Sequence, residues 1–345
     1  MNDFSHVATA YRADDFETYM ASVHGPAFAD YRRRFHDATA HDRTGYLPEF
    51  PITVHLELVN RCNLSCVMCW TANHSLRKAA LDLTTIKKLM VEGRRHGLPA
   101  AMLGMGSEAM VYKDIRAAIE IVQDSGVMDV FFATNGILLG EDMARFLVER
   151  QVARCWVSLD AATPETYVKI RGKDVLPKIE ANLLRLIRIK DERGSRLPDV
   201  RVSFVVQDEN RHERAAFVEK WRDRADHVDF QNLSDFSHIA EIAKTGDAPS
   251  APPPPPGVDL AKPFCPYPFE SLNVWSDGRV TPCCCFYGRD LVVGRVQEQT
   301  LKQIWDGPQM AAVRDQFRGQ APLSPTCRVC LSARDNKEWK AEVKS

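Results

Sequence analysis

The sequence has no run of about 18 consecutive apolar residues, which is the minimum for a membrane-spanning helix. Residues 1–8 contain no basic segment followed by an apolar stretch, so no secretory signal is expected. The chain also lacks an excess of either charge, because 45 Lys and Arg against 46 Asp and Glu leave a formal net charge of −1. These absences argue against a membrane protein and a polycationic nucleic-acid binder, and they predict a cytoplasmic protein.

The composition is that of a folded protein with about two domains. The 345 residues are 45% hydrophobic and 26% charged, which is enough apolar material for a packed core. Ten cysteines occur without an export signal, and grouped cysteines in the cytosol bind metal more often than they form disulfides. The cysteine groups are therefore the first candidates for chemistry.

Six short apolar runs alternate with amphipathic segments. The runs are residues 54–59, 101–103, 130–133, 155–159, 200–206 and 228–230. Apolar residues at helical spacing lie between them, for example Ile86, Leu89 and Met90 on one face. The alternation of strand and helix predicts an α/β fold with a partial parallel (β/α)6 barrel of the TIM type.

The chain divides into five predicted regions. They are an N-terminal helical extension at 1–50, the partial barrel at 51–240, a proline-rich linker at 241–260, a small cysteine-rich domain at 261–333 and a charged tail at 334–345. The linker contains five consecutive prolines at 252–256, which form neither helix nor central strand and predict a stiff spacer.

Polar or glycine-rich residues follow each of the six predicted strands. These segments are 60–70, 104–108, 134–136, 158–160, 207–210 and 231–232. In a parallel β/α barrel the carboxyl ends of the strands form one rim, and the active site lies there. Each segment alone is an ordinary loop, but six on one rim predict an active site.

The first of these loops carries Cys62, Cys66 and Cys69 in the spacing C-x3-C-x2-C. A closed zinc site needs a fourth ligand, for which His55 and His74 are the candidates. A [4Fe–4S] cluster can instead be held by three cysteines, which leaves one iron open to another ligand.

This loop, placed directly after the first barrel strand, resembles the signature loop of the radical S-adenosylmethionine (radical SAM) enzymes, and the resemblance covers about residues 52–235. It implies that the open iron binds the amino and carboxylate groups of SAM. One-electron reduction would then release a 5′-deoxyadenosyl radical that abstracts hydrogen from a substrate. It also implies a flavodoxin- or ferredoxin-type electron donor.

The resemblance also implies which residues bind SAM. They are Gly104, Gly106, Ser107 and Glu108 for the amino group, Ser158 and Asp160 at the ribose, Arg171 near the carboxylate, and Asn210 after the fifth strand. The sequence departs from the family pattern in three places: Met68 stands where an aromatic residue is common, Ser107 is inserted in the glycine–glutamate motif, and Ala109 replaces its proline.

A second group of cysteines follows the proline run. Cys265, Cys283, Cys327 and Cys330 can fill a four-thiolate site, and zinc fits such a site as well. Residues 274–281 predict a β-hairpin with an Asp-Gly turn that brings Cys265 near Cys283.

This region resembles the SPASM/twitch extension of radical SAM enzymes, which holds auxiliary clusters. No cysteine follows Cys330, and ten cysteines minus three and minus four leave only Cys155, Cys284 and Cys285. The resemblance therefore implies one auxiliary [4Fe–4S] cluster, for a total of two, with Cys284 or Cys285 as alternatives to Cys283.

The leading hypothesis is radical oxidation or epimerisation of a sugar, a cyclitol or a related carbinol. A peptide maturase of the SPASM class is the first alternative, although residues 1–50 are short for the peptide-binding domain that many maturases carry. A non-catalytic zinc-binding module is the second. The substrate is thus a small molecule or a peptide, and no catalytic residue is assigned.

Overall fold

The computed structural model describes residues 6–10, 16–69, 79–233, 260–283 and 291–332. Its central strands are β2 (Thr53–Leu56), β3 (Ala100–Leu103), β4 (Asp129–Thr134), β5 (Arg154–Ser158), β6 (Asp199–Val206) and β7 (His227–Asn232). Each pairs in parallel with the next along the chain. The predicted partial (β/α)6 barrel is therefore confirmed.

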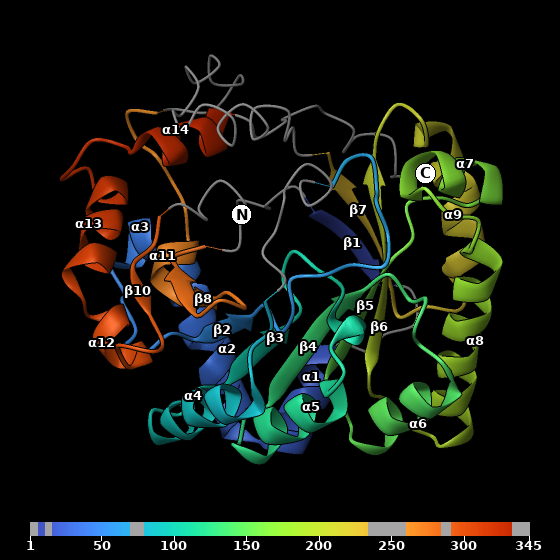
Figure 1. Cartoon of the computed structure of the whole chain (residues 1–345), viewed down its shortest axis with the longest axis horizontal. Helices are drawn as coiled ribbons and strands as arrows, with labels where there is room; N and C mark the ends of the chain where they lie inside the picture. The colour runs from blue at the N-terminus through green and yellow to red at the C-terminus, as the bar shows by residue number, and fades with distance from the viewer. Residues whose placement is uncertain (1–5, 11–15, 70–78, 234–259, 284–290, 333–345) are drawn as a thin grey trace.

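Helices cover the outer face of this curved sheet (Figure 1). They are α4 (Leu83–Arg95), α5 (Ile115–Asp124), α6 (Glu141–Glu149), α7 (Pro164–Arg171), α8 (Leu176–Glu192) and α9 (Arg214–Trp221). In α4 the buried side chains include Ile86, Leu89 and Met90, the face that the sequence pattern predicts. The side chain of Asp82 begins this helix by accepting a hydrogen bond of 2.8 Å from the backbone N–H of Thr85.

The N-terminal extension is only partly as predicted. It contains the helices α1 (Phe16–His24), α2 (Pro26–Thr39) and α3 (His41–Thr44), but the strand β1 (His6–Ala10) precedes them. The prediction of an all-helical extension is wrong at β1, which pairs antiparallel with β7. An edge strand leaves backbone N–H and C=O groups unpaired, and β1 satisfies those of β7.

Helices α1 and α2 close the end of the barrel opposite the rim. Phe16, Met20 and Phe28 pack with residues at or just before the starts of the strands, such as Ile52 and Ala100. These contacts bury large apolar side chains and so stabilise the docked position of the extension.

A buried polar network lies within this packing. Tyr31 on α2 donates a hydrogen bond of 2.9 Å to Asp129 at the start of β4. Arg154 at the start of β5 donates to both oxygens of the same carboxylate, at 2.9 and 2.7 Å. The network therefore links the extension to two barrel strands.

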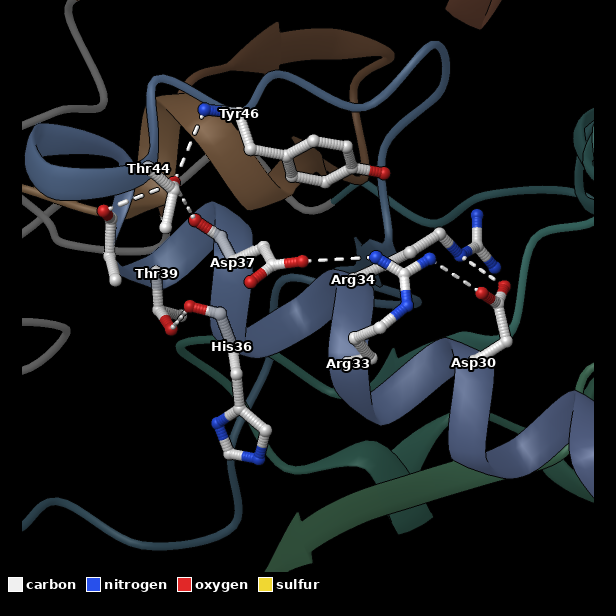
Figure 2. Close-up of polar contacts among 9 residues, drawn as sticks. Asp30, Arg33, Arg34, His36, Asp37, Thr39, Thr44 and Tyr46 are labelled. Atoms are coloured by element: carbon white, nitrogen blue, oxygen red, sulfur yellow. Dashed lines mark hydrogen bonds and ion pairs between the residues drawn. The ribbon is translucent and has the colours of Figure 1, made fainter.

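The outer face of α2 carries ion pairs of a different kind (Figure 2). Asp30 lies 2.7 Å from Arg33 and 2.9 Å from Arg34, and Arg33 also reaches Asp37 at 3.0 Å. Solvent screens exposed pairs of this type, so they support the helix but do not decide where it docks.

The C-terminal region continues the barrel sheet. Its elements are α11 (Tyr267–Glu270), β8 (Ser271–Val274), β9 (Arg279–Thr281), β10 (Gly294–Arg295), α12 (Leu301–Trp305), α13 (Pro308–Phe317) and α14 (Pro325–Ser332). β8 pairs in parallel with β2, so the ten strands within the described residues form one sheet in the order β1-β7-β6-β5-β4-β3-β2-β8-β9-β10. The domain boundaries given above remain a prediction, and most of the proposed linker lies outside the described residues.

The predicted hairpin is confirmed as β8 and β9, which pair antiparallel. Gly278 has φ +82° in its turn, a conformation that favours glycine. The buried carboxylate of Glu57, just after β2, accepts hydrogen bonds from the backbone N–H (3.0 Å) and the hydroxyl (2.6 Å) of Ser276 in this turn. The hairpin is thereby fixed to the strand that leads into the first cysteine loop.

Among the described helices, none combines the length and the apolar character that crossing a bilayer requires.

Removing the hydroxyl of Tyr31 tests how the extension is held. A hydrogen bond to a buried charged group contributes about 2 kcal/mol, so Tyr31→Phe should lower the free energy of unfolding by about that amount in urea titrations. Tyr19→Phe is the control, because the Tyr19 ring lies only partly buried beside Arg196. Equal stability of the two variants would contradict this account.

Candidate active site at the barrel rim

The loop that follows β2 lies at the carboxyl rim of the barrel and is tethered from two sides. The backbone N–H of Glu108, after β3, donates to the carbonyl of Arg61 at 3.1 Å. From the other side, Lys173 donates to the carbonyl of Asn63 at 2.7 Å, and the carbonyl of Ile170 accepts from the N–H of Val67 at 2.9 Å. The cysteine-bearing loop is therefore positioned by residues from neighbouring β/α units.

Its three thiols occupy different environments. Cys62 is exposed, Cys66 is buried and Cys69 is partly buried. The side-chain amide of Asn135, after β4, lies 3.9 Å from Cys62 Sγ, and Arg171 donates to Cys66 Sγ at 3.4 Å. Burial raises the pKa of Cys66, while the neighbouring Arg171 guanidinium acts in the opposite direction.

The described residues contain no three His, Cys, Asp or Glu side chains that converge on a single metal ion. A [4Fe–4S] cluster makes a different demand, because each thiolate binds its own iron and the sulfurs do not meet at one point. Three thiols on one loop are consistent with that demand.

The glycine–glutamate loop places a buried carboxylate beside the cysteine loop. Gly104 has φ +88°, and a Cβ there would lie 2.5 Å from the Cβ of Ala109, so the tight turn requires glycine. Gly106 also has a positive φ, of +68°. Ser107 follows, and its hydroxyl oxygen is buried without a hydrogen-bond partner among the described residues.

Glu108 is held by three donors. Its carboxylate accepts from the Thr134 hydroxyl at 2.8 Å, from the Asn135 N–H at 2.7 Å and from the Met110 N–H at 3.0 Å. Burial raises the pKa of this carboxyl, while the hydrogen bonds act in the opposite direction. The loop thus fixes the carboxylate at the rim.

The rim after β5 contains a buried ion pair. Asp160 has φ +60° and no exposed surface, and it pairs with Arg171 at the end of α7. Its Oδ1 accepts from the backbone N–H of Val205 at 2.7 Å. Ser158 precedes it at the end of β5 and is partly exposed.

Asn210 is completely buried, and its side-chain amide forms hydrogen bonds with backbone groups of two loops. It donates to the carbonyls of Asp160 and Val205 at 2.8 Å each, and it accepts from the N–H of Gln207 at 2.8 Å. These contacts tie the loop after β6 to the rim after β5. The hydrogen bonds show that Asn210 holds the backbone of both loops in place. A direct contact between Asn210 and SAM remains a prediction.

Some of the inward-facing side chains of the barrel are accessible. On β5, Cys155 and Val157 are buried in the core with the helices, whereas the alternating Trp156 and Ser158 are partly exposed. Met102 and Phe131 on β3 and β4 are also partly exposed. Other inward-facing side chains, among them His55, Ser203 and Asp229, are buried, so the accessible part of the lumen lies beside Met102, Phe131, Trp156 and Ser158.

Aromatic and polar side chains line this lumen. The guanidinium of Arg201 on β6 lies 3.8 Å from the centre of the Trp156 ring, and Phe131 packs 4.9 Å from the same ring. His55 lies edge-on to Phe131 at 6.3 Å, and burial lowers its pKa to about 4. His55 is therefore neutral near pH 7 and belongs to the lumen wall, not to the cysteine loop.

The second group of cysteines is distributed over three elements. Cys265 is buried just before α11, and its carbonyl lies 3.1 Å from Nε2 of His41 in α3. Cys283 follows β9, and its carbonyl accepts from the Thr281 hydroxyl at 3.0 Å. Cys327 and Cys330 lie one turn apart on α14. Cys284, Cys285 and His74 lie outside the described residues.

Several contacts at this site were not assigned from the sequence. Thr134 and Asn135 were recognised only as polar rim residues, and Lys173, Trp156 and Arg201 were not singled out. The period-2 alternation of the strands identifies Trp156 and Arg201 as inward-facing, and that was the available signal.

Asn210→Ala separates a holding role from a SAM-binding role. Loss of the amide leaves three buried backbone groups unpaired, so the free energy of unfolding should fall by about 3 kcal/mol in urea titrations. Normal stability together with a large loss of SAM affinity in equilibrium dialysis would show that Asn210 binds SAM directly.

Comparison with known proteins agrees with this geometry. Residues 56–219 match the model of the radical SAM superfamily, and residues 265–331 match that of the SPASM iron–sulfur cluster-binding domain. A probable GTP 3′,8-cyclase of Methanothermobacter thermautotrophicus is 28% identical over 163 residues, which are 47% of this chain and 51% of that protein. The 7,8-dihydro-6-hydroxymethylpterin dimethyltransferase of Methanocaldococcus jannaschii is 31% identical over 129 residues, 36% of this chain and 26% of the other. The chain thus spans about half, or less, of the length of these relatives.

Solved structures share the fold. BtrN in complex with AdoMet and 2-DOIA is 15% identical with a TM-score of 0.52, covering 85% of this chain and 99% of BtrN. The enzyme anSMEcpe with AdoMet and the Cp18Cys peptide is 16% identical with a TM-score of 0.58, covering 83% of this chain and 91% of the other. SuiB of Streptococcus suis with S-adenosylmethionine is 15% identical with a TM-score of 0.57, covering 83% of this chain and 72% of SuiB. The chain therefore contains a radical SAM domain followed by a C-terminal SPASM domain, and its cofactors are SAM and [4Fe–4S] clusters.

Proposed function

We propose that this enzyme oxidises or epimerises a small polyol, a sugar or a cyclitol, at a carbinol carbon in the barrel lumen. The observation that carries the proposal is the group of partly exposed inward-facing side chains, among them Phe131 and Trp156, beneath a rim of cysteine, carboxylate and ion-pair residues. Helices α1 and α2 are packed against the closed end of the barrel, so they do not line this opening. Among solved structures of this fold, BtrN was obtained with the ligand 2-DOIA and is covered over 99% of its length.

The cofactor ligands that we propose are Cys62, Cys66 and Cys69 for the SAM-binding cluster. Cysteine thiolates are the usual ligands of iron–sulfur clusters, and the tethered loop presents three of them at the rim. For the single auxiliary cluster we propose Cys265, Cys283, Cys327 and Cys330. When bound and reduced by one electron, the first cluster and SAM together supply the 5′-deoxyadenosyl radical that takes hydrogen from the substrate.

The protein's own contribution is to bind and orient SAM. The Glu108 carboxylate offers an anion for the ammonium group of the methionine part, and the unpartnered hydroxyl of Ser107 beside it fits a polar ligand. Ser158 supplies a partly exposed hydroxyl for the ribose, while Gly104 and Gly106 let the backbone turn closely around the ligand. The electron donor that we propose is a flavodoxin- or ferredoxin-type protein.

Trp156 and Phe131 offer flat apolar faces for the ring of a substrate, and neutral His55 offers no charge. Arg201 forms an ion pair of 3.6 Å with Asp229, which balances its charge within the lumen. A lumen of this kind suits a neutral ring with hydroxyl groups. A peptide is the second candidate, because anSMEcpe and SuiB, which share the fold, have been solved with peptides.

Deuterium transfer distinguishes these substrates. Reconstituted enzyme, SAM and dithionite are incubated with polyols deuterated at their carbinol carbons or with deuterated peptides. We expect 5′-deoxyadenosine to gain deuterium from a polyol, together with a ketone or an epimer as product. Deuterium transfer only from a peptide would replace this proposal with a maturase.

The ligand assignment predicts iron contents. Wild-type enzyme reconstituted without oxygen should hold about eight irons per chain, and the Cys62/Cys66/Cys69→Ala variant about four, without release of 5′-deoxyadenosine. Cys155→Ala is the control and should keep all of its iron, because this thiol is buried in β5. A wild-type content of only about four would disprove the auxiliary cluster.

The role of Glu108 predicts a loss of SAM affinity. Glu108→Gln removes the charge but keeps one acceptor oxygen, so we expect normal iron content and SAM binding weakened by about tenfold or more in equilibrium dialysis. The exposed Glu149, which pairs with Arg193, provides the control variant Glu149→Gln. Unchanged affinity in Glu108→Gln would remove Glu108 from the SAM site.

A further inference from the structure

Arg171 makes a contact that its assignment to the SAM carboxylate does not explain. Its Nη1 donates to Cys66 Sγ at 3.4 Å, and Nη2 forms the ion pair with Asp160. Arg171 is only 8% exposed and Asp160 is fully buried. Two nitrogens of the guanidinium are therefore committed to protein groups, and one of these groups is a proposed cluster ligand.

The arginine is held from both ends. Asp160, which receives the guanidinium, is fixed by the N–H of Val205 and, through its carbonyl, by the amide of Asn210. At the other end, Arg171 is the last residue of α7 and is followed by Gly172 with φ +77°. A Cβ on Gly172 would lie 3.4 Å from the carbonyl oxygen of Ser65, so α7 ends directly against the cysteine loop.

A fixed cation on a ligand sulfur has a predictable effect. Hydrogen bonds to the sulfurs and nearby charge set the reduction potential of an iron–sulfur cluster. Reduction adds one negative charge, so a donated N–H and a positive charge stabilise the reduced form more than the oxidised form. Such a contact raises the reduction potential and makes a one-electron donor more effective.

We propose that Arg171, held by Asp160, is a positioning residue that raises the reduction potential of the SAM-binding cluster through its hydrogen bond to Cys66. The proposal rests on the proposed ligand set Cys62, Cys66 and Cys69. Asp160 acts indirectly, because it sets the position of the guanidinium and does not itself contact the sulfur.

The test is a redox titration of the reconstituted enzyme without SAM, with dithionite as reductant, soluble mediators and detection by electron paramagnetic resonance. In Arg171→Gln the midpoint potential of the SAM-binding cluster should become more negative, while that of the auxiliary cluster is unchanged. Arg171→Lys keeps the positive charge but loses the planar guanidinium that contacts Cys66 and Asp160 together, so it should shift the same potential in the same direction by less.

Lys173→Gln is the matched control. It removes a positive charge from the neighbourhood of the same loop, but Lys173 donates to the carbonyl of Asn63 and not to a sulfur. In Lys173→Gln the midpoint potential of the SAM-binding cluster should stay close to that of the wild type. An equal shift in Lys173→Gln and Arg171→Gln would mean that charge alone matters, and it would overturn the role of the N–H···S contact.

Two further results would also overturn the inference. If Arg171→Gln leaves the midpoint potential of the SAM-binding cluster unchanged without SAM but weakens SAM binding, Arg171 binds the SAM carboxylate instead. If Arg171→Gln does not retain its iron, an unshifted midpoint potential of the SAM-binding cluster in Arg171→Lys would overturn the inference as well. Failure of the ligand set itself is recognised separately, because the Cys62/Cys66/Cys69→Ala variant would then keep all of its iron.

Discussion

The parallel pairing of β2 through β7 is the constraint on which the rest of the structure depends. It brings the carboxyl ends of all six strands to one rim, so residues from distant parts of the chain become neighbours. The cysteine loop after β2 then receives contacts from the loops after β3, β4 and β5. Arg171 reaches Cys66 across 105 positions of sequence, and Asn135 reaches Cys62 across 73.

The two ends of the barrel are built differently. At the closed end, α1 and α2 bury aromatic side chains, and Tyr31, Asp129 and Arg154 form a paired network. At the rim end, the inward-facing side chains are partly exposed and the polar residues converge. The apolar packing of the N-terminal extension thus lies at the opposite end of the barrel from the polar rim residues.

The local sequence pattern was sufficient for the strands, the outer helices and the rim. Period-2 and helical periodicity are local properties, and the order of strands follows once the sheet is parallel. The strand β1 was missed, because residues 6–10 gain a partner only through the edge of β7. The pairing of β8 with β2 and the bond between Ser276 and Glu57, 219 positions apart, were likewise invisible in a local pattern.

The resemblance supplied residue types for the SAM site, but it did not supply their contacts. It placed Arg171 near the SAM carboxylate, whereas the structure shows its guanidinium between Asp160 and Cys66. Asn210 likewise uses its amide to join two loops. The hydrogen-bond partners of a polar side chain depend on which neighbouring groups are already paired, and the tertiary structure determines that pairing.

The central claim is that the loop of Cys62, Cys66 and Cys69 holds a cluster whose open iron binds SAM. Electron paramagnetic resonance of the reduced enzyme, recorded before and after addition of SAM labelled with 15N at its amino group, tests this most directly. The account predicts a changed spectrum with hyperfine coupling to that nitrogen, absent in the Cys62/Cys66/Cys69→Ala variant. A spectrum that SAM leaves unchanged, with no coupling, would contradict it.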